Sequence, residues 1–318
     1  MKSKSKALNP SSSFERFSPE IVVGYSIIAG LYLMWILMYI GWRSDHSLFF
    51  FGVSALFFAS EYTRKLVYAF GFILLYWFIF DSIRLFPNYE VNPLHIAEPY
   101  LAEKAWFGIE TAQGVLTPNE YWAQHRHIIL STYTAIIYLA WIPVPLAFSL
   151  YHFFKGKRHI VIHYLFTFLL VSQLGLLFQF IYPAAPPWYV AEYGFEAIFN
   201  TPGNPGALIE VDQYYGISLF EGMYDMNGNV FAAIPSLHCA FPIILLYFAA
   251  AKKLKGWLAL AIIMMVSTWF AAVYTNHHYV IDVILGISTG ALAVSIYHFI
   301  VRKTRVYDWL NRYARFVS

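Results

Sequence analysis

A histidine and an aspartate four residues apart, His278 and Asp282, lie in an otherwise apolar part of the sequence. On a helix this spacing places both side chains on one face, so the carboxylate can accept a hydrogen bond from an imidazole N–H. Such a carboxylate fixes the tautomer and makes the other ring nitrogen more basic, as a nucleophilic histidine requires. His277 can take any role proposed for His278 but lacks the four-residue spacing to Asp282. Taken alone, the pair is also typical of polar residues that stabilise a helix end.

A second motif, PSLH at 235–238, indicates a helix start that can bind phosphate. Pro235 suits the first helical position, and the amides of a first turn carry a partial positive charge that attracts anions. Ser236 adds a hydroxyl donor, and His238 lies within reach of a phosphoryl group bound there. By itself the motif is equally typical of a capped helix with a structural histidine.

The third motif is PAAPPWY at 183–189. Its prolines end the preceding helix, and Trp188 and Tyr189 suit a membrane–water interface. An ordinary helix end with an aromatic belt has the same sequence pattern.

The elements that position these residues are predicted to be membrane-spanning helices. The 318 residues are 59% hydrophobic and 12% charged, with a mean hydropathy of +0.53, which excludes a soluble globular protein. Lipid offers no partners to backbone groups, so an all-α polytopic bundle follows. The single cysteine, Cys239, excludes an intrachain disulfide and a cysteine-based metal cluster.

Eight apolar segments have about the length that a spanning helix requires. They are residues 20–41, 47–60, 66–83, 128–151, 160–181, 234–250, 256–275 and 279–300. If the second and third form a hairpin that does not cross the membrane, the number falls to six and the later helices keep their orientation.

The positive residues of alternate loops predict the orientation. Lys155, Lys157 and Arg158, then Lys252, Lys253 and Lys255, then Arg302, Lys303 and Arg305 mark cytoplasmic loops, and this placement disfavours a nucleic-acid partner. The segment 183–230 contains six acids and no Lys or Arg, so it is predicted to be extracytoplasmic. Both termini are then cytoplasmic, and all three motifs reach the extracytoplasmic side.

Three outer segments carry further predictions. Residues 92–110 are amphipathic and suit the interface, and the Gly, Pro and Asn content of 200–230 predicts an irregular loop that caps the site. Thr117, Pro118 and Glu120 form a capping-box pattern that predicts a helix running into the fourth span. This helix would hold Arg126, flanked by two histidines, at its outer end.

The spacing of PSLH and HxxxD resembles the second and third motifs of the type 2 phosphatidic acid phosphatase superfamily, whose members have a six-helix core. Ala271 and Ala272 occupy the Ser and Arg positions of the usual third motif, and the first motif, KxxxxxxRP, is absent. The run YTNHHYVID at 274–282 and PAAPPWY instead resemble the inositol phosphorylceramide synthase branch known from fungi. The resemblance covers about residues 120–300. It implies residues 1–65 as a tail with two accessory helices, 66–301 as the catalytic core and 302–318 as a cytoplasmic tail.

This resemblance implies transfer of a phospho-headgroup, favouring phosphoinositol from phosphatidylinositol, to a ceramide-like lipid alcohol, without metal or cofactor. His278 would form a phosphohistidine, His238 would act as acid and then base, and Asp282 would hold His278. The amides that begin the sixth and eighth helices would hold the phosphoryl oxygens. A phosphodiester carries one charge, so fewer cations suffice than in a monoester phosphatase, and Arg126 is predicted as the remaining cation by its position. An exposed basic cluster that contacts lipid headgroups at the interface is equally typical of this sequence. The predicted substrate-binding residues are Pro235, Ser236, Arg126, His277, Asn276, Trp188 and Tyr189.

Two other functions remain open from the sequence. A lipid phosphate or polyprenyl pyrophosphate phosphatase would use the same residues with water as the acceptor, although the missing basic motifs count against it. A transporter or scaffold would place its polar groups near the membrane midplane instead of at one rim. The compact termini favour a bacterial inner membrane over a Golgi membrane. The sequence leaves the donor headgroup, the acceptor and the oligomeric state open.

Overall fold

The computed structural model describes residues 18–225 and 229–318, which separate into two compact units, Met1–Gly71 and Phe72–Phe316. The unit before Phe72 contains α1 (Pro19–Trp35), a π-helical turn (Ile36–Ile40), α2 (Ser44–Ala59) and α3 (Glu61–Ala69). Ser60 caps α3 through reciprocal hydrogen bonds with Thr63. The tail cations Lys2, Lys4, Lys6 and Arg16 lie outside the described residues.

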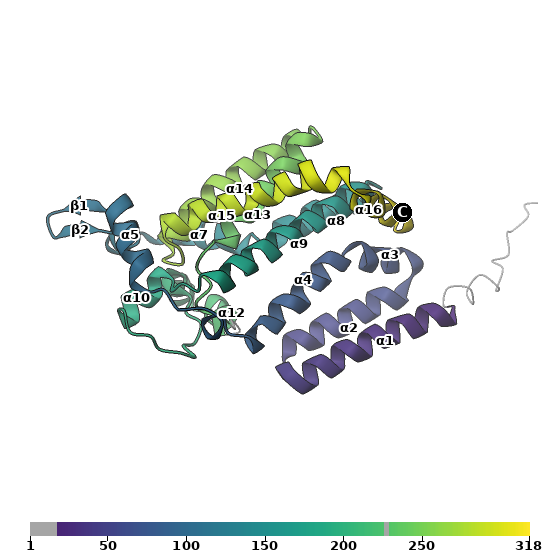
Figure 1. The fold of residues 1–318 in the computed structure, drawn as a ribbon, viewed down its shortest axis with the longest axis horizontal. Coiled ribbons are helices and arrows are strands. Elements are labelled where there is room, and N and C mark those ends of the chain that lie inside the picture. Colours follow the sequence, from purple (N-terminus) through teal and green to yellow (C-terminus); the bar gives the residue numbers. More distant parts are fainter. Residues whose placement is uncertain (1–17, 226–228) are drawn as a thin grey trace, which may run out of the picture. The chain divides into compact units, whose positions relative to one another are not determined.

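The second unit is a helical bundle with a group of short elements at one end (Figure 1). Its long helices are α4 (Gly71–Ser82), α7 (Ile128–Leu139), α8 (Pro143–Phe154), α9 (Arg158–Ile181), α13 (Leu237–Ala251), α14 (Lys255–Tyr274) and α15 (Val280–Ser295). After α15 the chain continues through Ile296–Ile300 (π), Val301–Lys303 (3₁₀) and α16 (Arg305–Phe316). The C-terminal segment, predicted only as a tail, thus ends in a helix.

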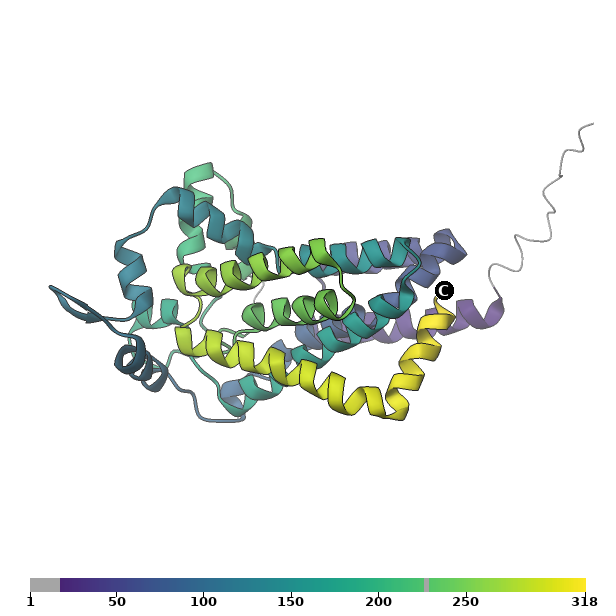
Figure 2. The same ribbon diagram turned by 90° about the horizontal axis from the view of Figure 1, so that it is seen from above.

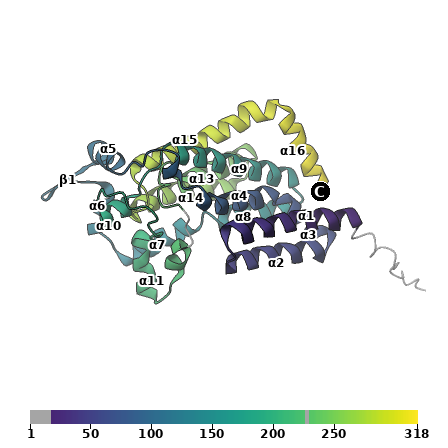
Figure 3. The ribbon, with the colours of Figure 1, turned by 60° about the horizontal axis from the view of Figure 1, so that its bottom comes forward.

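The short elements precede and follow the long helices at the end that carries the three motifs. They are the 3₁₀ turns Ile83–Leu85 and Asn88–Glu90, α5 (Ala97–Phe107), the hairpin β1 (Ile109–Thr111) and β2 (Gly114–Leu116), α6 (Pro118–Gln124), α10 (Pro187–Tyr193), the 3₁₀ turn Gly206–Leu208, α11 (Ile209–Tyr215) and α12 (Leu219–Asp225). Figures 2 and 3 show α5, α10 and the hairpin at one end of the bundle and α16 at the other.

All eight apolar segments predicted to span the membrane are helical. Four of the described helical segments are long and apolar enough to cross a membrane: Pro19–Ile40, Arg158–Ile181, Lys255–Tyr274 and Val280–Lys303. The number is six if α3 with α4 and α7 with α8 each count as one bent span, and α2 and α13 are shorter apolar helices. The all-α polytopic fold predicted from composition is therefore confirmed.

Close packing of α15 on α13 brings two of the motifs together. A Cβ on Gly286 would lie 2.2 Å from the carbonyl oxygen of Ser236, and one on Gly290 would lie 2.8 Å from that of Ala240. Real Cβ atoms do not approach backbone this closely, so glycine at both positions permits the helix contact. The start of α15 consequently lies directly beside the PSLH segment.

Two local predictions are corrected. The capping box at Thr117 is confirmed, but α6 ends at Gln124 and a separate helix begins at Ile128, so no single helix runs into the fourth span. That span is itself bent by 48° at Pro143, where the proline lacks an N–H donor and disturbs the preceding turn. The segment 200–230, predicted to be irregular, contains α11 and α12.

Candidate active site

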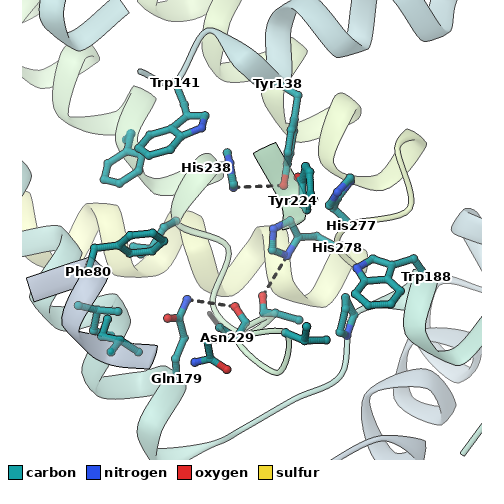
Figure 4. A pocket seen from close by; sticks show the side chains of 18 of the residues that line it. Phe80, Tyr138, Trp141, Gln179, Trp188, Tyr224, Asn229, His238, His277 and His278 are labelled. Carbon is teal, nitrogen blue, oxygen red and sulfur yellow. Dashed lines mark hydrogen bonds between the residues drawn. The ribbon is translucent and has the colours of Figure 1, made fainter. Parts of the chain in front are cut away.

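A cavity of about 160 Å³ lies at the motif-bearing end of the bundle. Histidines from two motifs meet aromatic residues and a few amides in its wall (Figure 4). Its lining comprises Tyr76, Phe80, Ile83, Arg84, Tyr138, Trp141, Leu176, Gln179, Pro186, Trp188, Tyr224, Asn229, Val230, Ala232, Ala233, Leu237, His238, Phe241, His277 and His278. Segments far apart in the sequence therefore form one small chamber.

The hydrogen bonds of His278 indicate which of its ring nitrogens carries the proton. Its Nδ1 lies 3.0 Å from the carbonyl oxygen of Ala233 and 3.4 Å from Oδ2 of Asp282. Both neighbours are acceptors, so Nδ1 carries the proton and Nε2 holds the lone pair. The predicted His278–Asp282 pair is present, and the carbonyl of Ala233 is a second acceptor that the sequence did not reveal.

Asp282 is fully buried and anchored through both its side chain and its backbone. Its Oδ2 accepts a hydrogen bond from the amide of Tyr279 at 2.9 Å, which fixes the carboxylate at the first turn of α15. Its carbonyl accepts the amide of Ser236 at 3.1 Å. The PSLH segment and the HxxxD helix are thus joined through the aspartate itself.

His238, in the first turn of α13, lies across the cavity from His278. Its Nδ1 is 3.2 Å from the hydroxyl of Tyr138, whose ring stacks on it with centroids 4.2 Å apart, and Trp141 contacts it edge-on. The ring centroids of His238 and His278 are 6.0 Å apart. Both rings line the same cavity, so a phosphoryl group bound there would have both imidazoles as neighbours.

The turn that carries both adjacent histidines is held by three other segments. Nδ2 of Asn119 donates to the carbonyls of Val273 and His278 at 2.9 and 3.0 Å. The amide of Trp188 donates to the carbonyl of Asn276, a residue with a positive φ of 65°, and the amide of Ala207 donates to that of Thr275. These bonds satisfy the turn's carbonyls and preorganise His278 before any ligand binds.

His277 occupies a different environment from His278. Its ring lies between Tyr138 and Tyr224, with centroid distances of 4.9 and 4.8 Å, and its Nδ1 is 3.0 Å from Oγ1 of Thr275. Burial, reinforced by the neighbouring His278, lowers the pKa of His277 to about 3. His277 is therefore a neutral wall of the cavity, and only His278 has a carboxylate partner.

The other predicted substrate-binding residues divide into two groups. Trp188 and His277 line the cavity. Ser236 is fully buried outside the lining, and Tyr189 is fully buried with its hydroxyl bonded to Glu196 and Ile198. Asn276 contributes its carbonyl to the turn instead of a side chain to the cavity.

Pro235 and Arg126 also lie outside the cavity lining. Pro235 contributes to a separate, largely apolar cavity of about 400 Å³ bordered by α5, α9 and α15. Arg126 forms an ion pair with Glu210 of α11. The position of Arg126 at the outer end of a helix therefore does not bring its charge into the chamber with the histidines.

Sequence reasoning missed Arg84, Gln179, Tyr138 and Tyr224, all of which line the cavity. A signal existed for Arg84, because a charged residue at the end of an apolar segment, three residues after Asp81, requires an explanation. The two tyrosines carried no such signal, since aromatic residues are abundant throughout the chain.

A buried carboxylate from α5 caps the start of α15, the helix that carries Asp282. Glu103 is fully buried, and its two oxygens accept the amides of Val280 and Ile281 at 2.9 and 3.2 Å. These amides begin α15, so the prediction that they hold phosphoryl oxygens is wrong. Burial is the main cause that raises the pKa of Glu103 to about 7, with Asp282 adding to the shift and the two amides opposing it.

Replacing Glu103 with Gln is expected to lower kcat by roughly 10-fold to 100-fold, because an amide offers one acceptor where α15 presents two donors beside Asp282. The pH dependence of stability should change too. A carboxyl with a raised pKa stabilises the fold below about pH 4.5, and this contribution is lost as the pH rises through about 7. Thermal midpoints in detergent between pH 5 and 8 should therefore fall more steeply in the wild type than in the variant. Parallel curves would contradict the assignment.

Within the part of the chain that the structure describes, no group of three or more His, Cys, Asp or Glu side chains is arranged to hold a metal ion.

Comparison with known proteins places this site in a family. Residues 112–296 match the PAP2 superfamily model. A Bacteroides thetaiotaomicron protein named phosphoinositol dihydroceramide synthase is 39% identical over 294 residues, which cover 92% of this chain and 96% of that protein. The Saccharomyces cerevisiae inositol phosphorylceramide synthase catalytic subunit AUR1 is 31% identical over 172 residues, 49% of this chain and 41% of the yeast protein. The Candida albicans inositol phosphorylceramide synthase is 28% identical over 172 residues, 51% of this chain and 35% of that protein.

No solved structure matches the chain significantly. The PSLH and HxxxD motifs lie within the matched region, and so do all the cavity-lining residues except Tyr76, Phe80, Ile83 and Arg84. The family model and these relatives agree with the histidine-lined cavity, and they show that the chain belongs to the PAP2 superfamily, in the branch of the inositol phosphorylceramide synthases.

Proposed function

We propose that this protein transfers phosphoinositol from phosphatidylinositol to the primary hydroxyl of a ceramide-like lipid and releases diacylglycerol. The observation that carries this proposal is the pairing of His278, whose Nδ1 is committed to Ala233 and Asp282, with His238 at a ring separation of 6.0 Å. One imidazole then presents a lone pair to the phosphorus, and the other presents a transferable proton to the leaving oxygen bonded to that phosphorus. The names of the relatives support the donor and the acceptor.

In the first step, Nε2 of His278 attacks the phosphorus of the donor. The bond between phosphorus and the glycerol oxygen breaks, and protonated His238 gives its proton to that oxygen, which leaves as diacylglycerol. His278 becomes a phosphohistidine that carries the inositol as its one ester group, and it keeps its Nδ1 proton. The charge on its ring is stabilised by Asp282.

In the second step, the now neutral His238 removes the proton from the acceptor hydroxyl. The acceptor oxygen attacks phosphorus, the N–P bond breaks, and both histidines return to their starting states. In this scheme Nδ1 of His238 donates its hydrogen bond to the hydroxyl of Tyr138, 3.2 Å away, and the other ring nitrogen exchanges protons with substrate.

The apolar character of the chamber favours a lipid alcohol over water as the acceptor. Tyr76, Phe80, Leu176 and Phe241 line the cavity around the histidines. Apolar walls limit the water that can reach the phosphohistidine and suit an acceptor delivered from the bilayer.

We place this reaction at the extracytoplasmic membrane surface, with both termini cytoplasmic. Lys155 ends α8, Lys252 follows α13 and Arg302 follows α15. These positions lie at the helix ends opposite to those that carry the histidines, and an excess of positive loop residues marks the cytoplasmic side.

Transfer assays with purified protein test the function directly. With inositol-labelled phosphatidylinositol and ceramide we expect equal amounts of diacylglycerol and labelled inositol phosphorylceramide, and little turnover when ceramide is omitted. Diacylglycerol release at the same rate without ceramide, or preferential release of inorganic phosphate from phosphatidic acid, would instead indicate a phosphatase. Complete inactivity with intact substrate binding would indicate a transporter or scaffold.

Replacing Asp282 with Asn should lower kcat by about 10³-fold to 10⁴-fold, because the amide removes the charge that stabilises the imidazolium and alters the tautomer preference of His278. The KM for the donor should change little. Asp308→Asn makes the same chemical change on an exposed position of α16 and should leave the rate unaltered. A rate within tenfold of the wild type in Asp282→Asn would remove the aspartate from the mechanism.

A further inference from the structure

The reaction proposed above needs a cation in the chamber, because the donor phosphodiester is an anion and gains negative charge on its oxygens as the histidine attacks. His277 is neutral, and Arg126 is paired with Glu210 outside the cavity lining. Among the lining residues, Arg84 is the one Lys or Arg side chain. It lies in the 3₁₀ turn that follows α4.

A carboxylate on the preceding turn holds the Arg84 guanidinium in place. One terminal nitrogen of Arg84 lies 3.1 Å from Oδ1 of Asp81, and its Nε donates to the carbonyl oxygen of Asp81 at 3.2 Å. The Asp81 side chain is 7% exposed, whereas that of Arg84 is 26% exposed. The carboxylate is therefore the more buried member of the pair, and the cation is the member that lines the cavity.

The side chains of Arg84, Gln179 and Asn229, which all line the cavity, suit a polyol phosphate. A guanidinium is planar and always charged, and it can donate two parallel hydrogen bonds to phosphate oxygens. Gln179 and Asn229 lie on the side of the cavity away from Trp141 (Figure 4). Gln179 is fixed by a 3.1 Å bond from Nε2 to the carbonyl of Ala232. Amide groups that line the same cavity as a guanidinium are suited to hydroxyls that surround a phosphate.

We propose that Arg84 binds the phosphate oxygens of the donor phospholipid and is the cation of this site, in place of Arg126. This inference rests on the proposed transfer reaction and adds the residue that holds the donor headgroup. In this role Arg84 lowers the KM for the donor and stabilises the transition state, while Asp81 acts only as a positioning residue.

The test compares kinetic constants for Arg84→Gln, Arg84→Lys, Asp81→Asn and Arg126→Gln, with Lys155→Gln as a charge-matched control at the opposite end of the bundle. Arg84→Gln should lower kcat/KM for phosphatidylinositol about 100-fold, with a raised KM. Arg84→Lys should recover part of the loss because it keeps the charge but not the planar fork. Arg126→Gln and Lys155→Gln should stay within about twofold of the wild type. Asp81→Asn should lose less than Arg84→Gln.

A soluble headgroup separates ligand binding from a structural role. Glycerophosphoinositol should inhibit the wild type competitively, and its inhibition constant should rise at least tenfold in Arg84→Gln. An unchanged inhibition constant, or equal losses in Asp81→Asn and Arg84→Gln with lowered thermal midpoints, would mean that the pair is structural and would overturn the proposal. Loss of activity in Arg126→Gln with retention in Arg84→Gln would also overturn it. Failure of the wild type to transfer phosphoinositol at all would instead count against the proposed function.

Discussion

Replacing His278 with alanine is expected to abolish headgroup transfer, lowering kcat by at least about 10⁴-fold, because the variant lacks the atom that bonds to phosphorus. The hydrogen bonds of His278 also predict which of its ring nitrogens bonds to phosphorus. Nδ1 is engaged by Ala233 and Asp282, so the covalent bond must form at Nε2. The ring of the adjacent His277 lies between Tyr138 and Tyr224, so His277 should not replace His278 as the nucleophile.

Trapping the intermediate gives the sharpest measurement. Wild-type protein incubated with inositol-labelled donor and no acceptor, then denatured in alkali, should retain up to one label per chain in an acid-labile bond. His278→Ala should retain none. His159→Ala, which alters an exposed histidine at the first turn of α9, should be labelled like the wild type. Label on a different residue of an active His278→Ala protein would end the nucleophile assignment.

Replacing His238 with alanine should reduce turnover of the natural donor by roughly 10²-fold to 10⁴-fold, through loss of the acid and base steps. The nucleophile remains in this variant. A donor whose leaving group needs no proton, such as the nitrophenyl ester of inositol phosphate, should therefore still react in the first step. We expect a burst of nitrophenol equal to the enzyme concentration, followed by slow turnover because the acceptor hydroxyl lacks a base.

The two histidine variants are thus distinguishable by one substrate. Stopped-flow absorbance should show the burst in His238→Ala and no burst in His278→Ala. If both variants are folded and neither shows a burst, His238 must do more than transfer protons, and the division of roles is wrong. A burst in His278→Ala alone would reverse the two assignments.

Interactions between residues close in sequence were predictable, because helix geometry converts spacing into contact. The four-residue step from His278 to Asp282, the capping box at Thr117 and the eight apolar helices all follow from local periodicity and composition. Two wrong predictions, a single helix into the fourth span and an irregular segment 200–230, have a local cause as well. Pro143 bends its span, and short polar helices such as α11 lie in a segment whose Gly, Pro and Asn content conceals them.

Only the tertiary structure decided which distant groups complete the chamber. Ala233 sets the tautomer of His278 from 45 residues away, and Glu103 caps α15 from 177 residues before Val280. Arg84 lines the cavity, whereas Arg126, the predicted cation, pairs with Glu210. Sequence by itself determined the His278–Asp282 pair and the membrane-spanning character of the chain, since both depend on residue type and local spacing. The choice of cation, cap and tautomer depends on how the helices pack, and no local pattern encodes that packing.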